Sequence, residues 1–246
     1  VYKRQAYGAD MSKYLDSGNE ARIKKAYESR DPRLQMAVIT PYAQYNGASS
    51  GIAHTYTLRW PYRGSDSAEP FDIRTDTNDK FYYLWRKFVP EGLEQTERDT
   101  YGLDIPLIRY AEVLLLKAEA LNEWGSTHES EAIRCVNEVR RRAGHVELNN
   151  ATYPATKVNG QSDLRERIRN EYYWEIGGED SMYFHELRWG TWKDKKFDNN
   201  RNGLMQMWGE TTYTWYWLGD QCWSWPIPAK EMEMNSNLEQ NEGWIN

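Results

Sequence analysis

The stretch over residues 105–123 (IPLIRYAEVLLLKAEALNE) constrains the fold of this chain more than any other segment. Its apolar residues recur at helical spacing, which predicts an amphipathic helix over the whole stretch. Pro106 stands where the first helical turn tolerates a missing N–H, and Gly125 follows the last periodic residue. The residues expected on the apolar face are Leu107, Ala111, Leu114, Leu115, Ala118 and Leu121.

Three more apolar residues widen the apolar surface of this predicted helix, so more than one neighbouring element must cover it. They are Ile108, Val113 and Leu116. Arg109, Glu112 and Glu119 fall on one side of the helix by their spacing. We interpret these three as a polar seam on a structural helix; a catalytic carboxylate pair is the alternative.

A second helix is predicted directly after the first. Ser126 and Glu129 match a capping box, and Gly144 is well placed just past the end. The second apolar stripe is Ala132, Ile133, Val136, Val139 and Ala143. Two antiparallel helices with a very short link, about 40 residues in all, have the size of one tetratricopeptide unit, although the full residue pattern of that repeat is absent.

Further elements are expected on either side of this helical hairpin. Asp163 with Glu166 gives the start signal of a third helix, and β-branched residues predict a short strand over residues 34–40. Residues 81–89 read as a strand or extended segment. The packing face of the third helix is expected to be Leu164, Ile168, Tyr172 and Ile176.

Two carboxylates of the third helix need a choice between catalysis and structure. Glu171 and Glu175 are four residues apart, a spacing that brings them together on one helix face. Arg165 and Arg169 lie on neighbouring rows of the same helix, where they can pair with the carboxylates and hold them ionised. We therefore favour a structural role over a paired acid and base.

Four segments in order, spanning residues 31–244, carry a resemblance to a known family. The helix RYAEVLLLKAEALNE with the helix that follows it resembles the C-terminal half of the SusD/RagB family. Asp31-Pro32-Arg33-Leu34 resembles the family's DPRL segment, and residues 165–190 resemble its helix with a trailing aromatic-Arg-Trp-Gly element. Residues 225–243 resemble its PIP…N-x-N-L…QN-x-G ending.

The resemblance implies a fold, a location and a partner. SusD/RagB proteins are surface glycan-binding lipoproteins of Bacteroidetes, which work in polysaccharide utilisation with a SusC-like TonB-dependent outer-membrane transporter. It implies a mainly α, SusD-like fold of tetratricopeptide-type helical hairpins with long loops and a few short strands. It also implies that residues 1–246 are the C-terminal part of one SusD/RagB-like domain, with the N-terminal repeats and the lipoprotein signal missing. An oligosaccharide or polysaccharide of the starch type would be bound at the cell surface of the outer membrane and delivered to the transporter.

Charge and hydropathy exclude several other classes. The net charge is −6 and the lysines and arginines are scattered, which argues against a nucleic-acid partner. No apolar run approaches the length of a transmembrane helix, so we expect membrane attachment only through a lipid anchor that this chain does not contain. The four histidines never fall at metal-ligand spacing, and we expect neither a metal nor a cofactor. Cys135 and Cys222 form no redox motif, and a disulfide between them stays open.

The composition is rich in aromatic residues with polar tips, 12 Trp and 18 Tyr against 5 Phe. Such rings favour half-wet positions, where their flat faces can stack on the C–H faces of sugars. Residues 41–70 read as a long loop in which Arg59, Arg63 and Asp66 could hydrogen-bond to sugar hydroxyls. The alternative is that its rings pin the loop to the helices. From this loop we predict as ligand-binding residues Tyr42, Tyr45, Trp60, Tyr62 and Arg63.

A second aromatic segment, residues 211–225, has a hairpin-like pattern with Gly219-Asp220 as the turn candidate. Trp215 and Trp217 share one face by the two-residue period of a strand, and Trp223 and Trp225 share a face of the predicted return strand. We favour a ring-rich flap packed on the helices, because Trp225 leads directly into the Pro226-Ile227-Pro228 segment. The alternative is a second aromatic platform, for which Trp215 and Trp217 are the predicted ligand-binding residues.

Three functions are compatible with the sequence. The first is a non-enzymatic glycan receptor that stacks sugars on exposed rings, with no catalytic residues. The second is an α-helical glycoside hydrolase, which requires two carboxylates in a cleft and a perturbed pKa on one of them. The third is a helical-repeat scaffold that binds peptides in a groove lined by helix faces.

Overall fold

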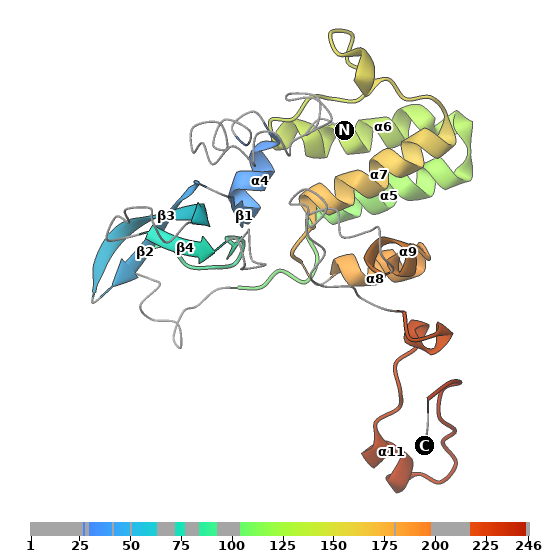
Figure 1. Cartoon of the computed structure of the whole chain (residues 1–246). Helices are drawn as coiled ribbons and strands as arrows, with labels where there is room; N and C mark the ends of the chain where they lie inside the picture. Colours follow the sequence, from blue (N-terminus) through green and yellow to red (C-terminus); the bar gives the residue numbers. More distant parts are fainter. Residues whose placement is uncertain are drawn as a thin grey trace. The chain divides into compact units, whose positions relative to one another are not determined.

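The computed structural model describes residues 27, 30–40, 42–49, 51–62, 72–76, 84–92, 104–179, 181–197 and 217–244. The chain forms two compact units, Val1–Met182 and Tyr183–Asn246. The described residues are mainly helical with a few short strands (Figure 1), as predicted. Among them, no helix combines the length and the apolar character needed to cross a membrane.

Three helices make the core of the first unit. Helix α5 (Tyr110–Trp124) packs against both α6 (Glu129–Arg142) and α7 (Gln161–Glu175), as Figure 1 shows. Ala118 of α5 and Ala132 of α6 are completely buried, and side chains this small let helix backbones approach closely. The larger side chains that fill the core are Leu114, Leu115, Leu121, Ile133, Val136, Val139, Leu164, Ile168 and Tyr172. The predicted helical hairpin and the packing face of the third helix are confirmed.

The helix starts differ from the predictions because contacts within the fold replace local signals. Helix α5 begins at Tyr110 rather than near Pro106, since Arg109 has extended backbone and Leu107 is 90% exposed. The capping box expected at Ser126 is wrong, because a 3₁₀ turn, η2 (Ser126–His128), comes first and no side chain caps α6. Asp163 lies inside the first turn of α7, where its Oδ2 accepts the backbone N–H of Asn159 at 2.8 Å.

The end of α6 matches its prediction. The last residue of the helix is followed by Ala143 and then by Gly144, whose φ of +68° lies in the left-handed region that glycine favours.

A short helix and a short strand follow the Asp31-Pro32 dipeptide. Asp31 accepts the backbone N–H of Arg33 at 3.0 Å and so starts α4 (Pro32–Ala37), with Pro32 at the first helical position. The strand predicted over residues 34–40 is therefore correct only for β1 (Val38–Ile39). It pairs antiparallel with β5 (Leu84–Trp85), so that Val38 lies opposite Trp85.

The long loop predicted over residues 41–70 is wrong for most of its length. Strands β2 (Gln44–Ser49) and β3 (Ile52–Tyr62) form an antiparallel hairpin, and β4 (Asp72–Asp76) pairs parallel with β3. Gly51 turns the hairpin with a φ of +76°. The buried side chains on this sheet and on β1 form a small separate core of Ile39, Tyr45 and Leu58.

The second unit contains the described part of α8 (Ser181–Arg188) from Tyr183 onward, α9 (Trp192–Lys196), η4 (Asp220–Trp223) and α11 (Ala229–Met234). Its C-terminal segment folds back onto residues 224–227. The Gln240 amide accepts the Ile227 N–H at 2.7 Å and donates to the Ile227 carbonyl at 2.9 Å. Because both neighbours of Ile227 are prolines without an N–H, no strand can pair regularly here, and a side-chain amide takes the place of the ladder.

The close approach of α5 and α6 gives a stability prediction. Replacing buried Ala118 by Leu should lower the free energy of unfolding by about 1–3 kcal/mol, because the added methyl groups have no space. The same change at the exposed Ala120, two residues along α5, should alter it by less than about 0.5 kcal/mol. Urea unfolding monitored by circular dichroism measures both, and equal effects would contradict the described packing.

Candidate functional site

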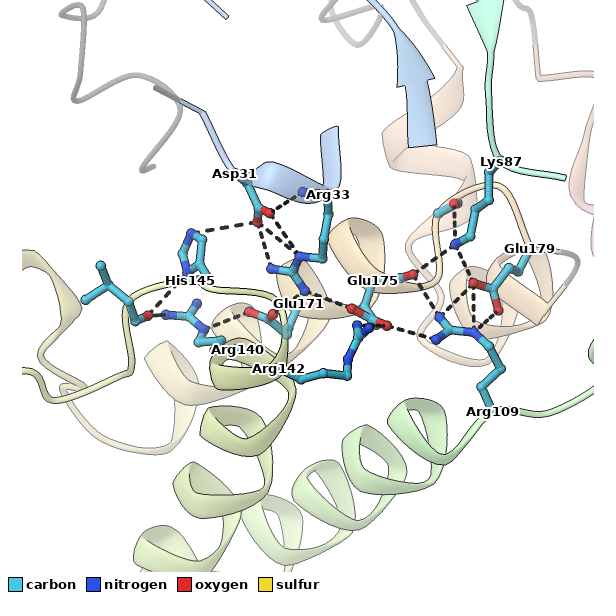
Figure 2. A network of polar contacts seen from close by, with 12 residues as sticks. Asp31, Arg33, Lys87, Arg109, Arg140, Arg142, His145, Glu171, Glu175 and Glu179 are labelled. Atoms are coloured by element: carbon cyan, nitrogen blue, oxygen red, sulfur yellow. Dashed lines mark hydrogen bonds and ion pairs between the residues drawn. The ribbon is translucent and has the colours of Figure 1, made fainter. Parts of the chain in front are cut away.

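Helix α7 presents two buried carboxylates, Glu171 and Glu175, to basic side chains from several other elements (Figure 2). Glu171 is completely buried. It accepts from Arg33 Nη1 and from Arg140 Nε, both at 2.8 Å. Each oxygen of this carboxylate thus has its own arginine, one from α4 and one from α6, which satisfies both oxygens of the buried charge.

Glu175 sits one turn further along and binds three guanidinium groups. They come from Arg109 at 2.9 Å, Arg142 at 2.6 Å and Arg33 at 3.1 Å. Burial alone would raise the pKa of Glu175, but the hydrogen bonds and charges of these arginines outweigh it and the pKa is lowered. A carboxylate held ionised in this way is suited to structure rather than to proton donation.

The predicted structural role of this carboxylate pair is supported, but the predicted partners are wrong. Arg165 pairs with Glu123 of α5, and Arg169 pairs with Glu166. The cations that reach Glu171 and Glu175 come from α4, α6 and the residue before α5, none of which helical spacing within α7 can reveal.

The Asp31-Pro32-Arg33 segment anchors α4 to α7. Asp31 binds Arg33 through both oxygens, with Nε at 3.0 Å from Oδ1 and Nη2 at 2.7 Å from Oδ2, and the remaining Arg33 nitrogen turns to α7. Burial raises the pKa of Asp31, and Arg33 more than offsets this, so that the pKa is lowered. His145 Nε2 lies 3.7 Å from Asp31, and its own pKa is lowered by burial and by Arg140.

A second branch of the network holds the turn after α7 (Figure 2). Arg109 donates to both oxygens of Glu179, at 2.9 and 2.7 Å, and Lys87 pairs with the same carboxylate. Lys87 Nζ also donates to the Glu175 carbonyl at 3.1 Å. Arg109 thus belongs to a structural polar cluster, as predicted, but its partners lie on α7 and the turn after it rather than on its own helix.

The first group of predicted ligand-binding residues divides in two. Tyr42 and Tyr45 are only 8% and 4% exposed, and the Tyr45 hydroxyl donates to the Pro90 carbonyl at 2.6 Å. Neither ring offers an open face as placed, which favours the alternative that these two pin the segment. Trp60 and Tyr62 lie on β3 with side chains outside the described residues, and Arg63 lies outside them altogether.

Trp217 lies in an aromatic cluster of the second unit, whereas Trp215 is outside the described residues. The ring centroid of Trp217 is 5.0 Å from that of Trp223 in a tilted arrangement and 5.6 Å from that of Trp192 in an edge-to-face arrangement. Its indole N–H donates to Asp220 at 3.3 Å. The predicted return strand is wrong for residues 220–223, which form the 3₁₀ turn η4 and bring Trp223 beside Trp217.

The most exposed ring among the described residues of this unit was expected to pack on the helices. Trp225 is 72% exposed, and its indole N–H donates to the Tyr183 hydroxyl at 2.9 Å. Phe184, also exposed, lies edge-on to Tyr183 at 5.3 Å between centroids. The two prolines after Trp225 were the available signal, because they prevent the chain there from continuing as a buried strand.

The fold is that of a helical-hairpin protein of the tetratricopeptide type. The second unit carries a cluster of tryptophan rings. The model of the SusD family matches residues 6–244, and the chain therefore belongs to the SusD family.

Two relatives show how much of such a protein the chain represents. It is 32% identical over 139 residues to SusD-like protein P38 of Formosa agariphila, covering 56% of this chain and 24% of the relative. It is 28% identical over 161 residues to the starch-binding protein SusD of Bacteroides thetaiotaomicron, covering 65% and 25%. The chain thus spans about a quarter of the length of these relatives.

Solved structures confirm the fold. A SusD-like protein of Bacteroides fragilis superposes with a TM-score of 0.55 at 22% identity, covering 89% of this chain and 40% of that one. A SusD homologue of Bacteroides thetaiotaomicron gives 0.57 at 23% identity, covering 87% and 41%. At this identity the comparison establishes architecture alone.

The network predicts a large difference between buried and exposed arginines. Replacing Arg33 by Met should lower the free energy of unfolding by about 3–5 kcal/mol, because it leaves Asp31 and Glu171 buried with too few cations. Replacing Arg165 by Met should cost about 1 kcal/mol or less, since its pair with Glu123 is exposed to solvent. Urea titrations of the two variants test this, and a similar loss in both would contradict it.

The lowered carboxyl pKa values predict loss of stability in acid. The folded protein binds protons to Glu175 and Asp31 less readily than the unfolded chain, whose values are near 4.5 and 3.8. Their contribution is therefore complete above about pH 5 and is lost as the pH falls through the folded values. Urea midpoints measured from about pH 6 to 3 should fall, and Glu175→Gln should show a shallower fall. An unchanged pH dependence in this variant would exclude Glu175 as a source.

Proposed function

We propose that the protein is a non-enzymatic glycan-binding protein that holds an oligosaccharide or polysaccharide on tryptophan rings. The observation that carries the proposal is Trp225, an indole that is largely exposed and yet fixed in orientation by its hydrogen bond to Tyr183. Sugar rings present flat C–H faces that stack on indole, and a ring held in place by another contact loses little conformational entropy on binding.

The rim of the aromatic cluster supplies groups for the sugar hydroxyls. Asp220 is highly exposed, and one oxygen contacts both the Trp217 N–H and Lys193 Nζ, at 3.3 and 3.4 Å. A carboxylate and an ammonium beside flat rings offer acceptors and donors next to the stacking surface, which is the usual division of labour in a small-molecule site. We keep Trp217 as a proposed ligand-binding residue of the second unit, and Trp60, Tyr62, Arg63 and Trp215 stay predicted ligand-binding residues.

The family relationship supports the glycan class and the cellular setting. One relative is named a starch-binding protein, and a starch-type glycan is the first ligand we propose. The proposal includes attachment to the outer-membrane surface through a lipid anchor and delivery of the glycan to a SusC-like TonB-dependent transporter. It also includes the prediction that residues 1–246 are the C-terminal part of a SusD/RagB-like domain, so further contacts to the glycan would come from the rest of that domain.

The carboxylates of α7 do not favour the hydrolase alternative. A retaining or inverting glycosidase needs one carboxyl group whose pKa is raised so that it can donate a proton. Glu175 shows the opposite shift, and Glu171 is enclosed by two arginines.

Affinity electrophoresis in gels containing amylopectin, xylan, mannan, pectin or alginate tests the proposal. The chain should be retarded by at least one polymer without release of reducing sugar, and release of sugar would transfer the assignment to a hydrolase. Trp225→Ala should weaken binding about 2- to 10-fold, the range expected for one aromatic contact. Trp124→Ala, which removes a comparably exposed indole from the end of α5, should leave it unchanged. Failure of every polymer to retard the chain would refute the proposed function.

A further inference from the structure

Trp85 is an exposed indole in the first unit that the sequence interpretation passed over. It lies on β5, opposite Val38 of β1, and 59% of its surface is exposed. Lys87 follows Trp85 by two residues, in the turn after β5, and both contact the turn after α7: Lys87 through the Gly177 carbonyl and Trp85 through Gly178.

The contact with Gly178 fixes which face of the indole is covered. A Cβ atom built on Gly178 would lie 2.7 Å from Trp85 Cζ3, 3.1 Å from Cη2 and 3.2 Å from Cε3. These are three consecutive ring atoms, and the outer two are only slightly farther away than the middle one. An approach within the ring plane would leave the outer two distinctly farther, so Gly178 lies over the face of the ring and not at its edge.

Glycine is therefore required at residue 178 for two reasons. Its φ of +85° is one that other residues rarely adopt, and any side chain would collide with the indole. The ring rests directly on main chain, and with this face covered the 59% exposure of the residue leaves the opposite face and the edges of the ring to meet solvent.

The floor beneath the ring is itself held by the charge network. The Glu179 N–H donates to the Ile176 carbonyl at 2.9 Å, and the Glu179 carboxylate binds both Arg109 and Lys87. The turn that supports the indole is thus tied to α5, α7 and the end of β5. A flat apolar face on an anchored floor, with charged groups next to it in the chain and on the same turn, has the character of a stacking platform.

We propose that the open face of Trp85 is a stacking platform for a pyranose ring of the glycan, separate from the aromatic cluster of the second unit. This inference rests on the proposed glycan-binding function. A pyranose suits this surface because it needs a single flat ring plus polar neighbours. A protein partner would need roughly 800 Å² per side, far more than one indole provides.

Substitutions at residue 85 separate ring stacking from general apolar contact. Trp85→Phe keeps a flat ring, so its affinity for the polymer that retards the parent chain should stay within about 2-fold of the parent's. Trp85→Leu keeps apolar volume without a flat face, so its affinity should be about 2- to 10-fold lower. Trp124→Leu is the matched control, because Trp124 is 76% exposed and stacks on His128, and it should not change binding. Far-ultraviolet circular dichroism verifies that each variant is folded.

Each result decides the inference. If Trp85→Leu binds as tightly as the parent, or Trp85→Phe is weakened as much as Trp85→Leu, the platform is refuted while the proposed function stands. If the parent is retarded by no polymer, both are refuted.

A second measurement does not depend on the folding of Trp85→Leu. In isotope-labelled protein, the indole N–H resonance that is absent from Trp85→Phe belongs to Trp85. This resonance should shift when an oligosaccharide fragment of the polymer that retards the chain is added. If it stays in place while other resonances shift, the platform is refuted.

Discussion

The pairing of the completely buried Glu171 with Arg33 and Arg140 is the interaction on which the arrangement of the first unit depends. Removing a carboxylate and two guanidiniums from water costs several kcal/mol for each ion, and their mutual attraction offsets this cost only in good geometry. The ions therefore add little net stability, but they strongly penalise any arrangement in which one partner is missing. This penalty selects the arrangement in which α4 and α6 both lie against α7.

The same network links the core to the surface. Glu175 shares Arg33 with Glu171 and shares Arg109 with Glu179, so one continuous set of ion pairs runs from α4 along α7 to the turn that follows it. Lys87 joins this set from the end of β5, two residues beyond Trp85. The turn beneath the exposed indole is thus held by charge compensation deep in the fold, and a binding surface supported in this way would lose less entropy when it takes up a ligand.

Local periodicity was enough to predict the helices but not what joins them. The buried stripes of α5, α6 and α7 follow the spacing of their apolar residues. Gly144, predicted just past the end of α6, has the positive φ that glycine favours there. The start of α5 was missed because Arg109 forms ion pairs with carboxylates some 70 residues away, and most of its side-chain hydrogen bonds go to Glu179. Strand β2 was taken for a loop because its polar and small residues give no clear alternation, and pairing with β3 supplies what propensity does not. Strand β3 does carry Tyr56, Leu58 and Trp60 at two-residue spacing, a strand signal that the loop prediction missed.

The aromatic surplus shows the same limit, because spacing predicts that a ring exists near the surface but not what holds it. The Tyr45 hydroxyl donates to a carbonyl and its ring is buried, whereas the Trp225 ring is exposed and its N–H donates to the Tyr183 hydroxyl. Trp85 needs no polar contact, since a glycine distant in the sequence makes room for its face. Trp124 is exposed to a similar degree but stacks on the side chain of His128, which can rotate away, while main chain beneath a ring cannot. What separates a ring suited to binding from a merely exposed one is therefore the rigidity of its support, and that property emerges only when segments far apart in the chain are brought together.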